Sequence, residues 1–372
     1  MIVMDELRNV YSLDWLELCG KCSHLIDCES VNEFTVEGVE TLYFKKRAYG
    51  TSLMRYTFDI TIGTGEDAGV MLSSPRSLLD PCTVFFKLSN WSLYSGKWKN
   101  IIASVASMGV TWGNITRLDL CCDSNVMVDG TEWSDFWADF VSGEVTCVRH
   151  KKYRVFGSQN EGINSISLSL PTANVGFKSY DKTLELLQGK DKPYIREKWR
   201  VSGLKSTPTC HVWRAELSLR VEACSTVNWE TGEIVNLVSM IDYLNDANVA
   251  RLFASFLRNH FEFRRSKEGF RKYDVCVLFG DIEGYPIRTL PSKRSMKSGR
   301  FERLLASYMH KYYDCEGSPI EVKQAIAVVS DWFYKESLDY ACVWRQSQKK
   351  DGKVVPSVFG DSDLCTHLER EK

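Results

Sequence analysis

The nine residues from Ile115 to Asp123 read Ile-Thr-Arg-Leu-Asp-Leu-Cys-Cys-Asp. Side chains of a β-strand alternate between two faces, so Leu118, Leu120 and Cys122 share one apolar face that suits a protein core. The opposite face carries three charged side chains and a thiol: Arg117, Asp119, Asp123 and Cys121. Carboxylates and an arginine on rigid backbone are what a divalent metal or a phosphate requires. The stretch therefore predicts a half-buried strand with a functional polar face.

A second segment repeats this pattern. Residues His211 to Arg220 read His-Val-Trp-Arg-Ala-Glu-Leu-Ser-Leu-Arg. With the same alternation, Ala215 and Leu217 face one side, whereas Arg214 and Glu216 face the other. In both segments an arginine lies two residues before an acid. We therefore expect the two strands to contribute to one shared site.

Composition limits the class of protein. The chain has 372 residues, which favours two or three domains, and a net charge of −1, so any nucleic-acid binding must rely on local basic patches. Its N-terminus lacks the apolar segment of a signal peptide, and the 13 cysteines are an odd number, so we expect a reducing cytoplasm. No apolar run approaches the roughly 18 residues of a membrane span, and we expect no membrane partner.

Local patterns predict an α+β fold with a mainly antiparallel sheet and packed helices. Short β-branched or aromatic runs predict strands at 13–18, 41–44, 56–62, 84–88, 154–156, 165–170 and 175–180. Helical spacing of apolar residues predicts helices at 97–108 and at 131–141, the latter with Thr131 as N-cap, and a short helix follows at 181–187.

The pattern changes after about residue 225. Helices are predicted at 234–244, 247–261, 301–313 and 321–338, with one strand at 274–279. We therefore expect a catalytic domain at 1–225, built from two α+β halves (1–110 and 111–225) or as one piece. A mostly helical accessory or DNA-binding region would follow at 226–345, and then a polar, partly disordered tail at 346–372.

Five short motifs follow one another in the first 220 residues. They are Leu13-Asp14-Trp15-Leu16, Arg117-Leu118-Asp119-Leu120 with Asp123, Gly157-Ser158, Tyr180-Asp181-Lys182 with Glu185, and Arg214-Ala215-Glu216. This order resembles the Rep_trans family, the rolling-circle replication initiation factors of plasmids and filamentous phages and the related relaxases of integrative mobile elements. The resemblance covers residues 13 to 220 and does not extend beyond about residue 225.

The resemblance implies a DNA-nicking endonuclease and strand transferase with Tyr180 as nucleophile, and Tyr153 is the second candidate. At a pKa of about 10, about one tyrosine in a thousand is ionised at pH 7, a handicap of about 4 kcal/mol. A neighbouring cation must offset this handicap, and Lys182, Arg117 and Lys178 are candidates. Mg²⁺ or Mn²⁺ held by three carboxylates would reverse the charge that the phosphate meets. The expected ligands are Asp119, Glu216 and Asp123.

Basic residues outside these motifs are candidates for DNA contacts. Lys178 and Arg214 lie on the motif strands, and a second group forms a basic run: Arg288, Lys293, Arg294, Lys297 and Arg300. Such a run either binds phosphates or is an ordinary solvated face. None of the six histidines is paired in a His-hydrophobic-His strand, which excludes the nickases that use that metal site. Cys19 and Cys22 lack a second Cys-x-x-Cys, so zinc is not expected.

The resulting hypothesis is a replication initiator or relaxase that binds an origin as single-stranded or hairpin DNA and stays linked to the 5′ end through a phosphotyrosine. A host helicase is implied as a partner by the resemblance alone, and the oligomeric state is left open, a homodimer included. Two alternatives stay open. One is a non-catalytic DNA-binding protein whose acids only pair with Arg117 and Arg214. The other is a metal-dependent nuclease that uses water.

Overall fold

The computed structural model divides the chain into two units, 1–291 and 292–372. It describes residues 9–25, 28–63, 65–76, 79–147, 150, 152–158, 162–169, 173–189, 191–265, 271–272, 279–280 and 282–289, all in the first unit. The helices expected at 301–313 and 321–338, the tail at 346–372 and nearly all of the strand at 274–279 lie outside the described residues.

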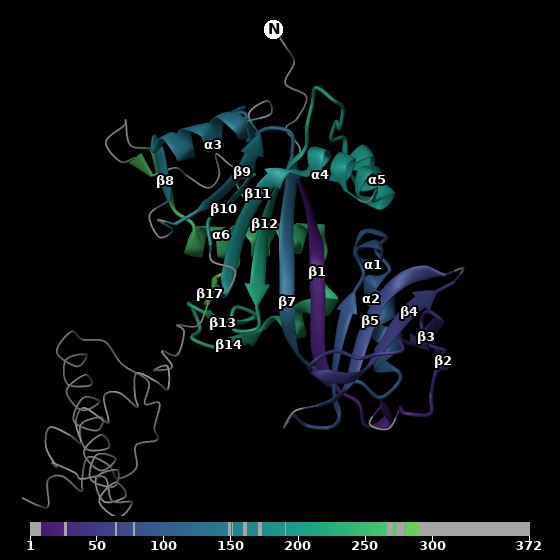
Figure 1. The fold of residues 1–372 in the computed structure, drawn as a ribbon. Coiled ribbons are helices and arrows are strands. Elements are labelled where there is room, and N and C mark those ends of the chain that lie inside the picture. Colours follow the sequence, from purple (N-terminus) through teal and green to yellow (C-terminus); the bar gives the residue numbers. More distant parts are fainter. Residues whose placement is uncertain are drawn as a thin grey trace, which may run out of the picture. The chain divides into compact units, whose positions relative to one another are not determined.

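The first unit is built on an 11-stranded sheet (Figure 1) with the order β2-β3-β4-β5-β6-β1-β7-β12-β11-β10-β9. In the part of the chain that the structure describes, every strand pairing is antiparallel. The predicted α+β class with a mainly antiparallel sheet is therefore confirmed. The strands are β1 (Val10–Lys21), β2 (Glu33–Val36), β3 (Leu42–Lys46), β4 (Met54–Ile62), β5 (Glu66–Pro75), β6 (Thr83–Leu88), β7 (Thr111–Ser124), β9 (Arg154–Ser158), β10 (Gly162–Ser167), β11 (Val175–Asp181) and β12 (Trp213–Arg220).

Helices and two small sheets surround this sheet. The helices are α1 (Asn90–Tyr94), α2 (Trp98–Ala106), α3 (Trp133–Ser142), α4 (Lys182–Gln188), α5 (Pro193–Ser202) and α6 (Asp246–His260), with 3₁₀ helices η1 (Ser23–Leu25) and η2 (Leu237–Tyr243). The small sheets are β14-β13-β17 (Ile234–Asn236, Ser225–Asn228, Ile287–Thr289) and β16-β15-β8 (Arg271–Lys272, Phe263–Arg265, Val145–Cys147). No helix among the described residues is both long and apolar enough to cross a membrane.

The apolar face of the central strands is covered by α3 and α6. Trp137 of α3 is fully buried, its ring centroid lies 6.1 Å from that of Phe177 on β11, and its indole nitrogen donates to Ser179 Oγ at 3.0 Å. From α6, Phe253 meets Tyr11 of β1 edge to face at 5.8 Å. Truncating such a core aromatic costs about 3–5 kcal/mol. This packing orients the sheet, because the alternate side chains of the same strands must point to the opposite face.

Most expected elements are present, and one is wrong. Helix α4 begins after Asp181, whose side chain accepts the Leu184 amide, whereas α3 begins two residues later than expected, with Glu132 instead of Thr131 as N-cap. The helix expected at 234–244 is instead β14 followed by η2. There the first residues pair with β13 and Asn236 caps a 3₁₀ turn, although the apolar spacing suits an α-helix. The elements that were not anticipated are β2, β5, β8, β13, β15, β16, β17, α1 and α5.

Candidate active site on the polar sheet face

The strand register gathers polar side chains in three rows across β11, β12 and β7. Directly paired residues of antiparallel strands point to the same face. The rows are Tyr180–Arg214–Asp123, Lys178–Glu216–Cys121 and Gly176–Ser218–Asp119. The two segments with an arginine before an acid are thus neighbours in the sheet, and their polar side chains share one face.

Strand β1 adds an acid that the sequence analysis did not select. Its pairing with β7 shifts between Leu13 and Trp15, and this bulge turns Asp14 toward the polar face. Asp14 Oδ1 accepts from Arg214 Nη1 at 2.6 Å and from the Tyr94 hydroxyl at 2.9 Å. The spacing of the buried leucines, 13, 16 and 18, contains one extra residue and was the available signal for this bulge.

Arg214 organises the acids of this face from a fully buried position. Its Nε and Nη2 donate to the two oxygens of Asp123, each at 2.7 Å, and Nη2 also donates to the Tyr94 hydroxyl at 2.8 Å. Trp199 of α5 donates to Asp123 Oδ2 at 2.7 Å. The expectation that Arg214 contacts DNA is therefore corrected, since its guanidinium is enclosed by protein. Asp123 has both oxygens engaged by these donors, which suits a positioning role.

Tyr180, Glu216 and Lys182 form a connected cluster beside Arg214. The Tyr180 hydroxyl donates to Glu216 Oε2 at 3.1 Å and accepts from Lys182 Nζ at 3.4 Å. Lys182 is also paired with Glu185 at 2.5 Å, and Lys178 Nζ lies 4.2 Å from the centre of the Tyr180 ring. Tyr180 is 7% exposed and Lys182 is 1% exposed. A tyrosine held between a carboxylate and two amines has a base and cations within reach.

Burial and like charges give Glu216 an unusual pKa. Burial, followed by the charges of Asp14 and Asp119, raises the pKa of Glu216 to about 7. Burial and then Glu216 raise the pKa of the Tyr180 phenol well above 10. Burial and then Arg214 lower the pKa of the Lys182 amine. Near neutral pH, Glu216 can therefore accept a proton that Tyr180 does not release unaided.

The remaining acids respond differently to the same surroundings. Burial acts to raise the pKa of Asp14, but the charges of Arg214 and Lys182 prevail and lower it to about 2. Asp119 is paired with Arg117 (Nη2 to Oδ2 2.5 Å) and accepts from Ser218 Oγ at 2.6 Å, yet burial keeps the pKa of Asp119 raised. Among the described residues, no three histidine, cysteine or acidic side chains stand as a ready metal-binding group.

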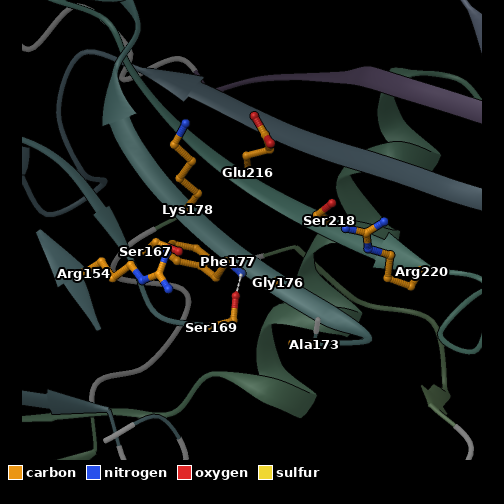
Figure 2. Close-up of a pocket in the computed structure, with 10 residues that line it drawn as sticks. All are labelled: Arg154, Ser167, Ser169, Ala173, Gly176, Phe177, Lys178, Glu216, Ser218 and Arg220. Carbon is orange, nitrogen blue, oxygen red and sulfur yellow. Dashed lines mark hydrogen bonds between the residues drawn. The ribbon is translucent and has the colours of Figure 1, made fainter. Parts of the chain in front are cut away.

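A groove of about 220 Å³ runs along the same face beside Glu216 (Figure 2). Figure 2 shows Lys178 and Glu216 side by side on neighbouring strands, with Arg154 and Arg220 flanking the groove. The floor of the groove has little room for a side chain at Gly176, because a Cβ there would lie only 3.1 Å from Ser169 Oγ. Arg154 and Arg220 were not among the predicted site residues, although both are cations on predicted strands.

Two other sets of predicted residues lie elsewhere. Tyr153 packs its ring edge-on against Phe140 of α3 at 5.1 Å, on the apolar side of the sheet and away from Glu216. Of the basic run, Arg288 is exposed on β17 in a separate small sheet. The others, Lys293, Arg294, Lys297 and Arg300, lie outside the described residues.

Comparison with known proteins finds similarity at the level of structure and not of sequence. No family model matches the chain, and no curated protein matches its sequence. A solved rolling circle replication initiator protein from Geobacillus stearothermophilus is similar over 72% of this chain and 93% of its own, at 14% identity and a TM-score of 0.44. Values this low define neither the family nor the activity of this chain.

Proposed function

We propose that the chain is a DNA-nicking and strand-transfer enzyme in which Tyr180 attacks a phosphodiester and Glu216 accepts the phenolic proton. The observation that carries the proposal is the hydrogen bond from the Tyr180 hydroxyl to Glu216, a carboxylate whose pKa is about 7. A general base works best when its pKa lies near the working pH. The order of the five motifs supports the same reaction.

In the proposed reaction the DNA phosphate changes its partner from a 3′ oxygen to the Tyr180 oxygen. The Tyr180 oxygen forms a bond to phosphorus as its proton moves to Glu216 Oε2, and the bond from phosphorus to the 3′ oxygen breaks while that oxygen takes a proton from solvent water. The products are a 5′-phosphotyrosine and a free 3′-hydroxyl. Lys182, donating to the Tyr180 oxygen, stabilises the negative charge that develops there. Because a phosphodiester is exchanged for a phosphodiester, a 3′-hydroxyl can later reverse the step and transfer the strand.

Mg²⁺ or Mn²⁺ remains part of the proposal, with a revised ligand set. The carboxylates that would hold it are Asp119, Glu216 and Asp14, which would have to move together, since they do not stand as a ready metal-binding group among the described residues. Besides burial, the charge of Asp14 raises the pKa of both other acids, and a cation would relieve this repulsion. Asp123 is left out, since the fully buried Arg214 and Trp199 engage both of its oxygens. Asp119 would have to exchange its bonds to the partly exposed Arg117 and to Ser218 for the metal. When bound, the metal would polarise the phosphoryl oxygens. It would also lower the pKa of Glu216, so ligation and proton acceptance compete at that side chain.

In this proposal the substrate is origin DNA, single-stranded or extruded as a hairpin, of a replicating or conjugative mobile element. The helicase partner and a homodimer are proposals without structural support. A second candidate, a non-catalytic DNA-binding protein, is favoured by the Arg117–Asp119 and Arg214–Asp123 ion pairs that the structure contains. That candidate leaves the Tyr180–Glu216–Lys182 cluster without a role.

The test is covalent capture of DNA. The protein is incubated with Mn²⁺ and labelled single-stranded fragments tiled across the element that carries its gene, and the products are run on a denaturing gel. We expect a covalent band that Tyr180→Phe removes and that Tyr153→Phe, the matched control, retains. Free cleavage without a covalent band would indicate a water-using nuclease, and intact DNA would indicate the non-catalytic protein. An adduct that survives in Tyr180→Phe would refute the choice of nucleophile.

A further inference from the structure

An exposed aromatic side chain lies on the polar face, two strands away from Tyr180. Register pairs Phe156 on β9 with Ser165 on β10, and Ser165 with Tyr180 on β11. The neighbouring residue Val155 pairs with Ile166, which is fully buried on the apolar face, so Phe156 belongs to the opposite face. Phe156 is 62% exposed. At the usual strand spacing it stands about 10 Å from Tyr180.

The next row of the same face is basic. Arg154 pairs with Ser167, and Ser167 pairs with Lys178, which itself pairs with Glu216. These residues line the 220 Å³ groove together with Arg220, and small side chains form its floor. The groove therefore reaches Glu216, the hydrogen-bond partner of Tyr180, and at its other side Arg154, two residues from the exposed phenyl ring.

A single exposed apolar side chain usually needs no explanation. Phe156 differs from that ordinary case in its position, since it shares a cross-strand row with the proposed nucleophile and lies two residues from a cation that lines the groove. Aromatic rings on a basic surface bind single-stranded nucleic acid, because each unpaired base offers a flat face for stacking while its phosphates meet the cations. A base inside a duplex is already stacked and cannot be bound in this way.

We propose that the face formed by β9 to β12 is a binding platform for single-stranded DNA, on which Phe156 stacks against a base near the nicked position while Arg154 and Lys178 contact the flanking phosphates. The inference rests on the proposed function, because only a nucleophilic Tyr180 places the nicked position beside Phe156. It adds the way in which that site would hold an unpaired strand, by stacking a base on Phe156 beside two phosphate-binding cations.

The experiment measures binding of the full chain to a fluorescent oligothymidine by anisotropy in EDTA, where no nicking interferes. Because stacking on an aromatic ring is lost, Phe156→Ala should weaken binding about ten-fold, whereas Phe156→Trp should bind as well as the native protein. Tyr49→Ala, which removes an exposed ring from the loop between β3 and β4, is the matched control and should change nothing. Arg154→Gln should lower the slope of log affinity against log salt by about 0.7.

A second oligonucleotide isolates the stacking contribution. On an oligomer of abasic sites the native protein should bind more weakly, and Phe156→Ala should cause no further loss, because no base remains to stack. An equal loss on both oligomers, or no loss on oligothymidine, would overturn the inference. If Phe156→Ala weakens binding but the native protein forms no covalent adduct, the proposed nicking activity fails while the platform stands. If the adduct forms and Phe156→Ala binds normally, the platform fails alone.

Discussion

Replacing Glu216 with glutamine should make the protein more stable and less active at the same time. The pKa of Glu216 is raised from 4.5 to about 7, chiefly by burial and then by Asp14 and Asp119. A raised folded-state pKa means that the protonated form is favoured on folding. The stability that the protonated Glu216 contributes is fully present below pH 4.5 and is lost as the pH rises through 7. At about 1.4 kcal/mol per pH unit, the native protein should lose about 3 kcal/mol relative to Glu216→Gln by pH 8.5.

The assay is urea unfolding of both proteins between pH 4.5 and 8.5. Glutamine has nearly the same shape and its carbonyl can still accept from the Tyr180 hydroxyl, so little difference in the free energy of unfolding is expected at pH 4.5. Glu233→Gln, at an exposed loop position, is the control and should follow the native protein at every pH. A difference between Glu216→Gln and the native protein that stays constant over this range would refute the assigned cause of the raised pKa.

Three further outcomes follow from the same site. Glu216→Gln lacks the base, so it should form the covalent adduct about 10²-fold to 10⁴-fold more slowly than the native protein in single-turnover gels. Its rate should also not rise between pH 6 and 7. Asp14→Asn removes a negative charge beside Glu216, so the acid limb of the native pH–rate profile should move to lower pH; an unchanged limb would exclude this electrostatic coupling. Asp123→Ala leaves Arg214 buried without its bidentate partner and should cost about 3–5 kcal/mol of unfolding free energy, whereas a loss below 1 kcal/mol would argue against its positioning role.

Several features of this protein are determined by short stretches of sequence alone. The alternation in 115–123 and in 211–220 sorts each side chain to one of two faces, because strand geometry imposes a period of two whatever the partner strand is. The start of α4 is equally local, since Asp181 accepts an amide only three residues away. The α+β class and the Tyr180, Lys182 and Glu216 candidates depended on such patterns and on the order of the motifs.

Other features were decided only by tertiary structure. The sequence predicts that Arg214 is a cation available to DNA, yet its side chain is buried and donates to Asp14, 200 residues away in the chain. Register between strands decides three further features. These are the bulge that turns Asp14 toward the site, the hydrogen bond from Tyr180 to Glu216, and the placement of Phe156 in the row of Tyr180. Register and burial arise from contacts between segments far apart in sequence, so periodicity can assign a residue to a face but cannot say which residue stands beside it.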